Sequence, residues 1–254
     1  MLKALFFDMD GVIVDTERDG HRVAFNKTFE DFGLPHSWDP ELYHSLLQVA
    51  GGKERMRHFF KTIADPATLP PEHDDDEFIA KLHKHKTNRF IELLEAGSLP
   101  LRPGVLRFMQ EAQERGLQLL ICTTSNERAA GAIVNTMLSD IKFQTILAGD
   151  IVSKKKPDPE IYHLALERAG CSAAEALVIE DSHNGVLAAK AAGIPVLATY
   201  NQYTEQEDLS DAEIIADCLG EEHGPKATVR KPEAGLAADG VLRLEEVRSY
   251  IFAE

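Results

Sequence analysis

The hydrophobic positions of this chain follow two different patterns. Short, continuous apolar runs, typical of strands buried on both faces of a sheet, occur at the N-terminus and again after residue 101. They cover 2–7, 117–122, 143–148, 176–180 and 194–199. Apolar residues at helical spacing lie between the later runs, over 105–115, 158–169 and 182–192. This alternation predicts a parallel sheet joined by right-handed crossover helices.

Residues 16–97 show the helical pattern alone. Prolines punctuate this stretch, as helix ends and loops require. We therefore predict an α/β protein with a Rossmann-like, parallel-sheet core, residues 1–15 and 98–254, and an all-helical cap domain, residues 16–97, inserted after the first strand. Residues 201–254 are harder to interpret. There we expect a short edge strand at 214–215 and a last helix at 244–252.

Two aspartates end the first apolar run. Asp8 and Asp10 are alternate residues of an extended segment, so their side chains point the same way, at the strand end where open α/β sheets bind ligands. Close carboxylates repel each other unless a cation or a proton lies between them. Oxygen ligands suit Mg²⁺, which is often shared with a substrate phosphate. A plain strand followed by a turn at Asp10-Gly11 would explain the same residues without any metal.

Three further segments carry polar residues at matching places. The apolar run 117–121 leads into Cys122-Thr123-Thr124-Ser125-Asn126, and the run 176–179 leads into Glu180-Asp181-Ser182. Between them, Lys156 directly precedes Pro157. Taken singly, each segment has a structural explanation: a capped strand end, a helix N-cap, or a solvated loop. Because all these segments occur in one chain, a shared function explains them with fewer assumptions than a separate structural role for each.

The four segments together resemble the haloacid dehalogenase-like phosphotransferases. That family has Asp-x-Asp-Gly, then Thr or Ser after the second strand, then Lys-Pro, then Glu-Asp, and this chain has all four in that order. The resemblance spans most of the chain. It implies a helical cap that opens and closes over the catalytic face, and a phosphoryl transfer that depends on Mg²⁺.

The resemblance also implies a role for each matching residue. Asp8 would be the nucleophile that forms an aspartyl-phosphate, and Asp10 would be the general acid and then the general base. Lys156 would neutralise Asp8 and the phosphoryl group. The residues that hold the phosphoryl group and the substrate after the second strand would be Thr123, Thr124, Ser125 and Asn126.

The implied Mg²⁺ site uses the same strand ends. Asp8 and Asp181 would bind the ion through their carboxylates, and Asp10 through its main-chain carbonyl. Glu180 would bind it as well or support its ligands. Few carboxylates, phosphate oxygen and water together fit the octahedral preference of Mg²⁺.

The most distinctive segment of the predicted cap is Gly51-Gly52-Lys53-Glu54-Arg55. Glycines allow close approach of a ligand, and cations near a helix N-terminus suit a phosphate, although a solvated loop-to-helix junction is the plain alternative. With Glu17 and His21, this segment resembles the CbbY subfamily, sugar-bisphosphate phosphatases that remove xylulose-1,5-bisphosphate, an inhibitor of the Calvin-cycle enzyme Rubisco. The resemblance implies that Lys53 and Arg55 bind the retained phosphate, and that Glu17 and His21 contact sugar hydroxyls.

Two other functions stay open from the sequence. Val12 follows Gly11, a variant that relatives such as the β-phosphoglucomutases also have, so a phosphosugar mutase would share the core motifs. A non-catalytic phosphosugar-binding module would be expected to lack one of the key residues. Asp8, Asp10, Lys156 and Asp181 are all present.

Charge and composition narrow the partners further. A formal net charge of -15 disfavours nucleic acid as a partner, and no apolar stretch of about 18 residues suggests a membrane span. Scattered cysteines suit a reducing compartment. Because a strand begins by about residue 3, without room for a targeting segment, we expect a cytoplasmic monomer, or a protein of the plastid stroma after removal of a transit peptide. The basic stretch 83–86 is predicted to be a solvated helix face.

Overall fold

The computed structural model describes residues 1–97, 99–233 and 235–252. Seven strands of these described residues form one sheet with the order β3-β2-β1-β4-β5-β6-β7. The strands β1 to β6 run parallel to their neighbours, and β7 runs antiparallel to β6. The strand bounds are β1 Ala4–Phe7, β2 Gln118–Cys122, β3 Phe143–Leu147, β4 Ala176–Glu180, β5 Val196–Thr199, β6 Ile214–Ala216 and β7 Val229–Lys231. The predicted fold class, an α/β protein with a Rossmann-like sheet, is confirmed.

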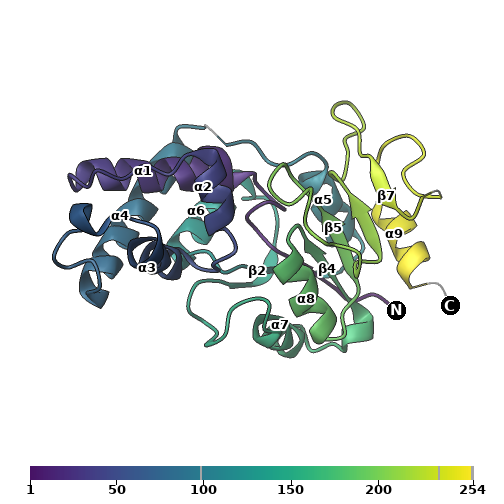
Figure 1. The fold of residues 1–254 in the computed structure, drawn as a ribbon. Helices are drawn as coiled ribbons and strands as arrows, with labels where there is room; N and C mark the ends of the chain where they lie inside the picture. Colours follow the sequence, from purple (N-terminus) through teal and green to yellow (C-terminus); the bar gives the residue numbers. More distant parts are fainter. Residues whose placement is uncertain (98, 234, 253–254) are drawn as a thin grey trace.

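Helices cover both faces of this sheet (Figure 1). Leu5 and Phe7 of β1 join one apolar cluster with α5, α6 and α9, whereas Ala4 and Phe6 join a second cluster with α7 and α8. Because side chains alternate along a strand, a continuous apolar run is needed to satisfy both clusters. The helix bounds are α5 Val105–Glu114, α6 Glu127–Met137, α7 Glu160–Ala169, α8 His183–Ala191 and α9 Leu244–Ile251, with a 3₁₀ turn, η3, at Ala173–Glu175.

The chain between β1 and α5 forms a separate helical layer beside the carboxyl end of the sheet (Figure 1). Its described residues form helices and no strand: the π-helical η1 Glu17–His21, α1 Arg22–Asp31, α2 Pro40–Leu46, α3 Gly52–Thr62, the 3₁₀ turn η2 Pro66–Thr68 and α4 Asp76–Glu95. An aromatic cluster that includes Phe25, Phe29, Trp38 and Tyr43 fills this layer. Tyr203, from a loop that follows β5, also belongs to this cluster.

Three elements differ from the sequence-based expectation. The strand expected at 214–215 is not at the edge, because β7 pairs with it on its outer side. Only one residue of β7 is apolar, Val229, so its sequence carries no strand pattern. The helix α6 was not anticipated either. Its sequence, Glu127–Met137, contains Gly131, which lowers helix propensity, and its apolar face is built mainly from small alanines.

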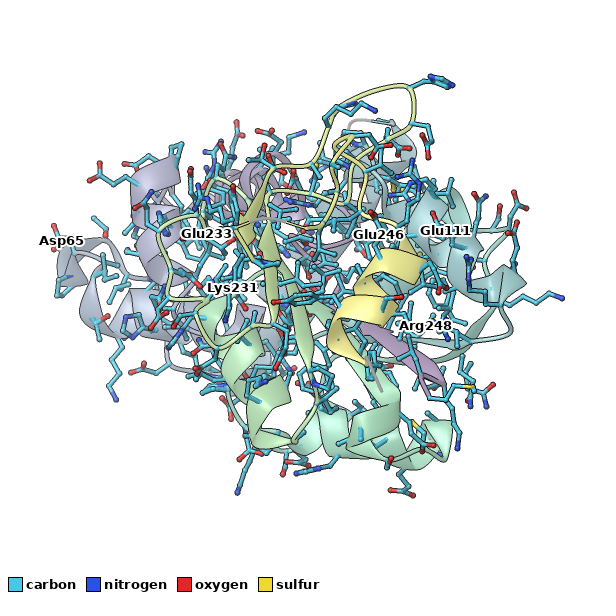
Figure 2. The ribbon with its side chains drawn as sticks, turned by 90° about the vertical axis from the view of Figure 1, so that its right-hand side faces the viewer. Asp65, Glu111, Lys231, Glu233, Glu246 and Arg248 are labelled. Carbon is cyan, nitrogen blue, oxygen red and sulfur yellow. The ribbon has the colours of Figure 1, made fainter. Side chains whose placement is uncertain are left out.

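The helix α9 and the loop before it pack against α5 on the side of the molecule that Figure 2 faces. The guanidinium of Arg107 donates to the carbonyls of Leu219 and Leu242, each at 2.9 Å. The N–H of Leu244, at the start of α9, donates to the Glu111 carboxylate at 2.9 Å. These bonds hold α9 on the core. Among the described helices, none has the length and apolar character to cross a membrane.

Candidate active site

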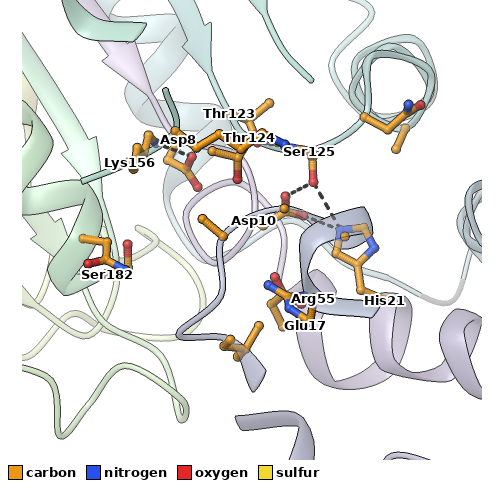
Figure 3. Close-up of a pocket in the computed structure, with 18 of the residues that line it drawn as sticks. Asp8, Asp10, Glu17, His21, Arg55, Thr123, Thr124, Ser125, Lys156 and Ser182 are labelled. Carbon is orange, nitrogen blue, oxygen red and sulfur yellow. Dashed lines mark hydrogen bonds and ion pairs between the residues drawn. The ribbon is translucent and has the colours of Figure 1, made fainter. Parts of the chain in front are cut away.

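The carboxyl ends of β1, β2 and β4 face the helical layer across one cavity of about 350 Å³ (Figure 3). Such a volume suits a small metabolite. Figure 3 shows Asp10 between Asp8 and Lys156 on one side and Glu17 and Arg55 on the other. Almost every site residue predicted from the sequence lines this cavity: Asp8, Asp10, Glu17, His21, Gly51, Gly52, Lys53, Arg55, Thr123, Thr124, Ser125, Asn126, Lys156 and Asp181.

Asp8 is held in place directly after β1. Its backbone N–H donates to the carbonyl of Ile179 on β4 at 2.9 Å, and its carboxylate lies 2.6 Å from Nζ of Lys156. Burial raises the pKa of Asp8 to about 8, although the Lys156 charge opposes this shift. For Lys156, burial alone would lower the pKa, but Asp8 and Glu180 raise it above its usual range. The lysine is therefore a fixed cation beside a buried carboxylate.

Glu180 lies behind the cavity wall and is fully buried. One carboxylate oxygen accepts from Lys156 at 2.5 Å and from the Tyr162 hydroxyl at 2.7 Å, and the other accepts from the N–H of Asp181 at 3.0 Å. A Cβ at Gly185 would come within 2.0 Å of this carboxylate, so the first turn of α8 requires glycine there. Glu180 thus fixes both Lys156 and the backbone of the next residue.

The carboxylates of Asp8, Glu180 and Asp181 form a buried acidic cluster, in which one oxygen of each lies within 4.8 Å of the others. Burial raises the pKa of Asp181, and the charges of Glu180 and Asp8 raise it further. The Asn201 amide donates to Asp181 at 2.7 Å, and Gly11 leaves room for it, since a Cβ there would lie 2.1 Å from its carboxylate. An all-oxygen cluster of this kind fits a hard divalent cation, which would relieve the repulsion.

Asp10 accepts hydrogen bonds on both carboxylate oxygens. The hydroxyls of Thr16 and Ser125 donate to it, and Nε2 of His21 lies 2.9 Å away (Figure 3). Burial alone would raise the pKa of Asp10, but these partners, His21 first, hold it well below its usual range. Because Thr16 and His21 flank the start of the helical layer and Ser125 follows β2, the Asp10 carboxylate joins both parts of the molecule.

Lys86 of α4 was missed by the sequence interpretation, which placed 83–86 on a solvated helix face. Lys84 is exposed, but Lys86 is buried and both His83 and Lys86 line the cavity. Nζ of Lys86 lies 3.0 Å from Nδ1 of His21 and 4.6 Å from the centre of the Phe25 ring. As an ammonium group, Lys86 only donates, so Nε2 of His21 would carry the proton that faces Asp10. Burial lowers the pKa of Lys86 to about 8.

A signal for Lys86 was present in the sequence. Leu82 and Phe90 lie four positions before and after it, so all three residues occupy one helix face, and that face is buried. A charged residue in the middle of an apolar face is a candidate for a functional group.

The segment after β2 turns the chain toward the cavity. Thr123 is buried, its N–H donates to the carbonyl of Leu147, and its hydroxyl accepts from the N–H of Ser125 at 3.1 Å. Asn126 caps α6 by accepting from the N–H of Arg128 at 3.0 Å. The polar groups of this turn and the N-terminus of α6 therefore face the same space as Asp8.

Glu17 and Arg55 form the floor of the cavity on the side of the helical layer. Arg55 is only 7% exposed, and its guanidinium donates to the carbonyl of Leu46 at 3.1 Å and to the Tyr43 hydroxyl at 3.0 Å. That hydroxyl in turn donates to Glu17. Arg55 thereby contributes a fixed cation beside an acceptor, Glu17, that still lines the cavity.

Two lysines meet at the mouth of the cavity. Nζ of Lys53 lies 2.5 Å from Asp150, and Nζ of Lys155 lies 3.3 Å from the same carboxylate and 3.4 Å from Glu54. Lys155 was not singled out from the sequence, because in a run of three lysines only Lys156 precedes the proline. Lys53 belongs to α3 and Lys155 to the loop before α7, so their meeting is visible only in three dimensions.

Comparison with known proteins places this site in a family. Residues 2–193 match the model of the haloacid dehalogenase-like hydrolases. A CBBY-like protein from Arabidopsis thaliana is 47% identical over 221 residues, which cover 86% of this chain and 69% of that protein. Protein CbbY from Cereibacter sphaeroides is 38% identical over 226 residues, which cover 87% and 94% of the two chains.

Solved structures agree with these matches. The crystal structure of CbbY from Rhodobacter sphaeroides in complex with phosphate has a TM-score of 0.79 and 38% identity, and the match covers 88% of this chain and 97% of that one. A mutant of that CbbY, solved in complex with xylulose-(1,5)bisphosphate, matches with the same TM-score, identity and coverage. The chain therefore belongs to the haloacid dehalogenase-like hydrolases and, within them, to the CbbY-like phosphatases.

Proposed function

We propose that the chain is a Mg²⁺-dependent sugar-bisphosphate phosphatase that hydrolyses xylulose-1,5-bisphosphate to xylulose 5-phosphate and phosphate. The observation that carries this proposal is one cavity with lysine ammonium groups in two separate regions. Lys156 lies beside Asp8 at the strand ends, and Lys53 and Lys155 lie together at the mouth. A substrate with a phosphate at each end needs both regions, whereas a monophosphate needs one. The complex of the related CbbY with xylulose-(1,5)bisphosphate supports this assignment.

At the catalytic end, the proposed reaction begins with attack of a carboxylate oxygen of Asp8 on phosphorus. The new bond yields an aspartyl-phosphate, and the bond from phosphorus to the sugar oxygen breaks. Lys156 and the polar turn at Thr123 would stabilise the transferring phosphoryl group. Residues 124–126 complete this turn.

Asp10 is proposed to move the protons. In the first step, protonated Asp10 would donate its proton to the leaving sugar oxygen. The negative charge of an arriving phosphate favours this protonated form of Asp10. Returned to its carboxylate form, it would accept a proton from the water that hydrolyses the aspartyl-phosphate. The donors Thr16, Ser125 and His21 suit this second role, because they hold the ionised carboxylate in one orientation.

Asp8, Asp181 and the main-chain carbonyl of Asp10 are the proposed Mg²⁺ ligands, with Glu180 in contact with or next to them. When bound, Mg²⁺ would supply positive charge to the phosphoryl oxygens and neutralise the acidic cluster. The observed convergence of Asp8, Glu180 and Asp181 supports this choice of residues.

The helical layer is proposed to be a cap domain, residues 16–97, that moves relative to a core of residues 1–15 and 98–254. It supplies Glu17, His21, Lys53 and Arg55 to the cavity. Glu17 is proposed to contact sugar hydroxyls. Closure of such a cap would exclude bulk water from the reaction.

A panel of phosphorylated sugars tests the proposal. Phosphate release would be measured with purified protein and Mg²⁺ on xylulose-1,5-bisphosphate, xylulose 5-phosphate, other sugar bisphosphates and β-glucose 1-phosphate. We expect kcat/KM to be highest for xylulose-1,5-bisphosphate. Conversion of β-glucose 1-phosphate to glucose 6-phosphate without phosphate release would favour a mutase instead. If no substrate is turned over, the proposed enzymatic function fails and a non-catalytic phosphosugar-binding module is favoured.

A further inference from the structure

The carboxylate of Asp150 lies between two cations at the cavity mouth. One of its oxygens is 2.5 Å from Nζ of Lys53 and the other is 3.3 Å from Nζ of Lys155. The two lysines come from opposite sides of the cavity, one from the helical layer and one from the core. Two cations held about an anion on this scale form the arrangement that a phosphate group would also occupy.

The charges at this mouth cancel as they stand. Lys53 and Lys155 contribute two positive charges, and Asp150 and Glu54, which is 3.4 Å from Lys155, contribute two negative charges. The neighbouring His83 adds no positive charge near neutral pH, because burial lowers its pKa to about 3. A phosphate dianion placed here would meet a neutral cluster with a carboxylate in the middle. Its binding is favourable only if that carboxylate moves away.

Asp150 is the most exposed member of the cluster. Its side chain is 61% exposed, whereas that of Lys155 is 16% exposed. It lies in the loop after β3, next to Gly149, which has a φ of 65°. Ion pairs with this much exposure contribute little free energy. The carboxylate can therefore exchange its two lysine partners for water at small cost.

We propose that Asp150 is a specificity-determining residue whose carboxylate takes the place of the substrate's second phosphate between Lys53 and Lys155. This inference rests on the proposed function. The retained phosphate displaces the Asp150 carboxylate and binds both lysines in its place. A monophosphate leaves Asp150 where it is and gains nothing from the mouth. The carboxylate thus keeps the two lysines paired in the absence of substrate, and it weakens binding of every bisphosphate by the free energy of its own displacement.

The test compares Asp150→Asn with the unchanged protein on xylulose-1,5-bisphosphate and on p-nitrophenyl phosphate, which has no second phosphate. Because an exposed ion pair is worth little, we expect KM for the bisphosphate to fall about two- to fivefold. KM for p-nitrophenyl phosphate should stay the same. The matched control is Asp140→Asn, which removes one exposed carboxylate from the loop at the opposite end of β3. It makes the same change in net charge and should change neither KM.

The outcomes separate this inference from the proposed function. If the unchanged protein shows no preference for the bisphosphate, the proposed function fails. If that preference is present but Asp150→Asn leaves KM unchanged, Asp150 is an ordinary surface ion pair and the inference fails alone. A rise in KM would also overturn it, because Asp150 would then orient Lys53 for the phosphate. If Asp150→Asn and Asp140→Asn lower KM for the bisphosphate equally, the change in net charge explains the effect and the inference fails.

Discussion

At the scale of single residues, the site depends on Asp8 as a buried carboxylate with one fixed cation. Replacing Asp8 by Asn should lower kcat by at least about a thousandfold, because an amide is a poor nucleophile toward phosphorus. The fold should persist, since the backbone bond of Asp8 to Ile179 does not involve its side chain. Phosphate release and the far-ultraviolet circular dichroism spectrum would be measured on the same purified sample. Activity within tenfold of the unchanged protein would contradict the nucleophile assignment.

The acidic cluster leads to a second prediction at this scale. Chelation of divalent metal should abolish phosphate release, and added Mg²⁺ should restore it. Asp181→Ala removes one of few proposed anionic ligands, so we expect the Mg²⁺ concentration for half-maximal activity to rise at least about tenfold. Titration of Mg²⁺ against initial rate would measure this shift. Full activity of the chelator-treated protein would refute the metal requirement.

At the scale of elements, α4 carries a partly buried histidine, His83, among cations. Burial first, and then the charges of neighbours such as Lys86, Lys53 and Lys155, lower the pKa of His83 to about 3. In the unfolded chain this pKa is about 6.5. Between these values the unfolded chain binds a proton that the native chain does not, so the free energy of unfolding falls as the pH falls. One such group contributes a slope of at most about 1.4 kcal/mol per pH unit.

His83→Gln should remove this contribution. Urea unfolding of both proteins, measured between about pH 7 and pH 5, would give the free energy of unfolding at each pH. We expect the unchanged protein to lose more stability than the variant as the pH falls. Parallel pH profiles would show that His83 becomes protonated in the native state without cost. His73→Gln, at a partly exposed position before α4, serves as the control.

The strands and loops also show which site residues could be predicted from the sequence. Asp8, Thr123 and Asp181 were predictable because each follows a buried strand, and parallel strands bring their carboxyl ends to one edge. Lys155 was not predictable, because its neighbour Lys53 is about a hundred residues away in the chain and on another element. β7 was missed because its short, polar sequence pairs only through its backbone.

Arg55 shows a different limit of sequence reasoning. Arg55 follows two glycines closely in the sequence, and it lines the cavity. The buried hydrogen bonds to Tyr43 and to the carbonyl of Leu46 depend on the packing of α2 against α3, and no local pattern specifies that packing. The role of Arg55 toward a phosphate stays a prediction. Its role in holding the acceptor group of Glu17 follows from the structure.

At the scale of the whole molecule, one loop connects the acidic cluster with the helical layer. Asn201 donates to Asp181, and two residues later Tyr203 enters the aromatic cluster of that layer. The centre of the Tyr203 ring lies 6.4 Å from that of Tyr43 and 5.3 Å from that of His44. Tyr43 in turn contacts Glu17 and Arg55. The chain after β5 therefore reaches both the proposed metal ligands and the proposed sugar-binding groups.

If the helical layer is a mobile cap, Tyr203 stabilises its closed position. Tyr203→Ala should therefore lower kcat/KM for the preferred substrate by about two- to tenfold, the equivalent of one lost aromatic contact. Tyr203→Phe retains the ring and should keep most of this activity. The melting temperatures of both variants would be measured by thermal unfolding, and activity would be assayed well below them. Both variants are then fully folded in the assay, so a loss of activity cannot be attributed to unfolding. Unchanged kcat/KM for Tyr203→Ala would mean that the loop only packs against the helical layer and takes no part in closure.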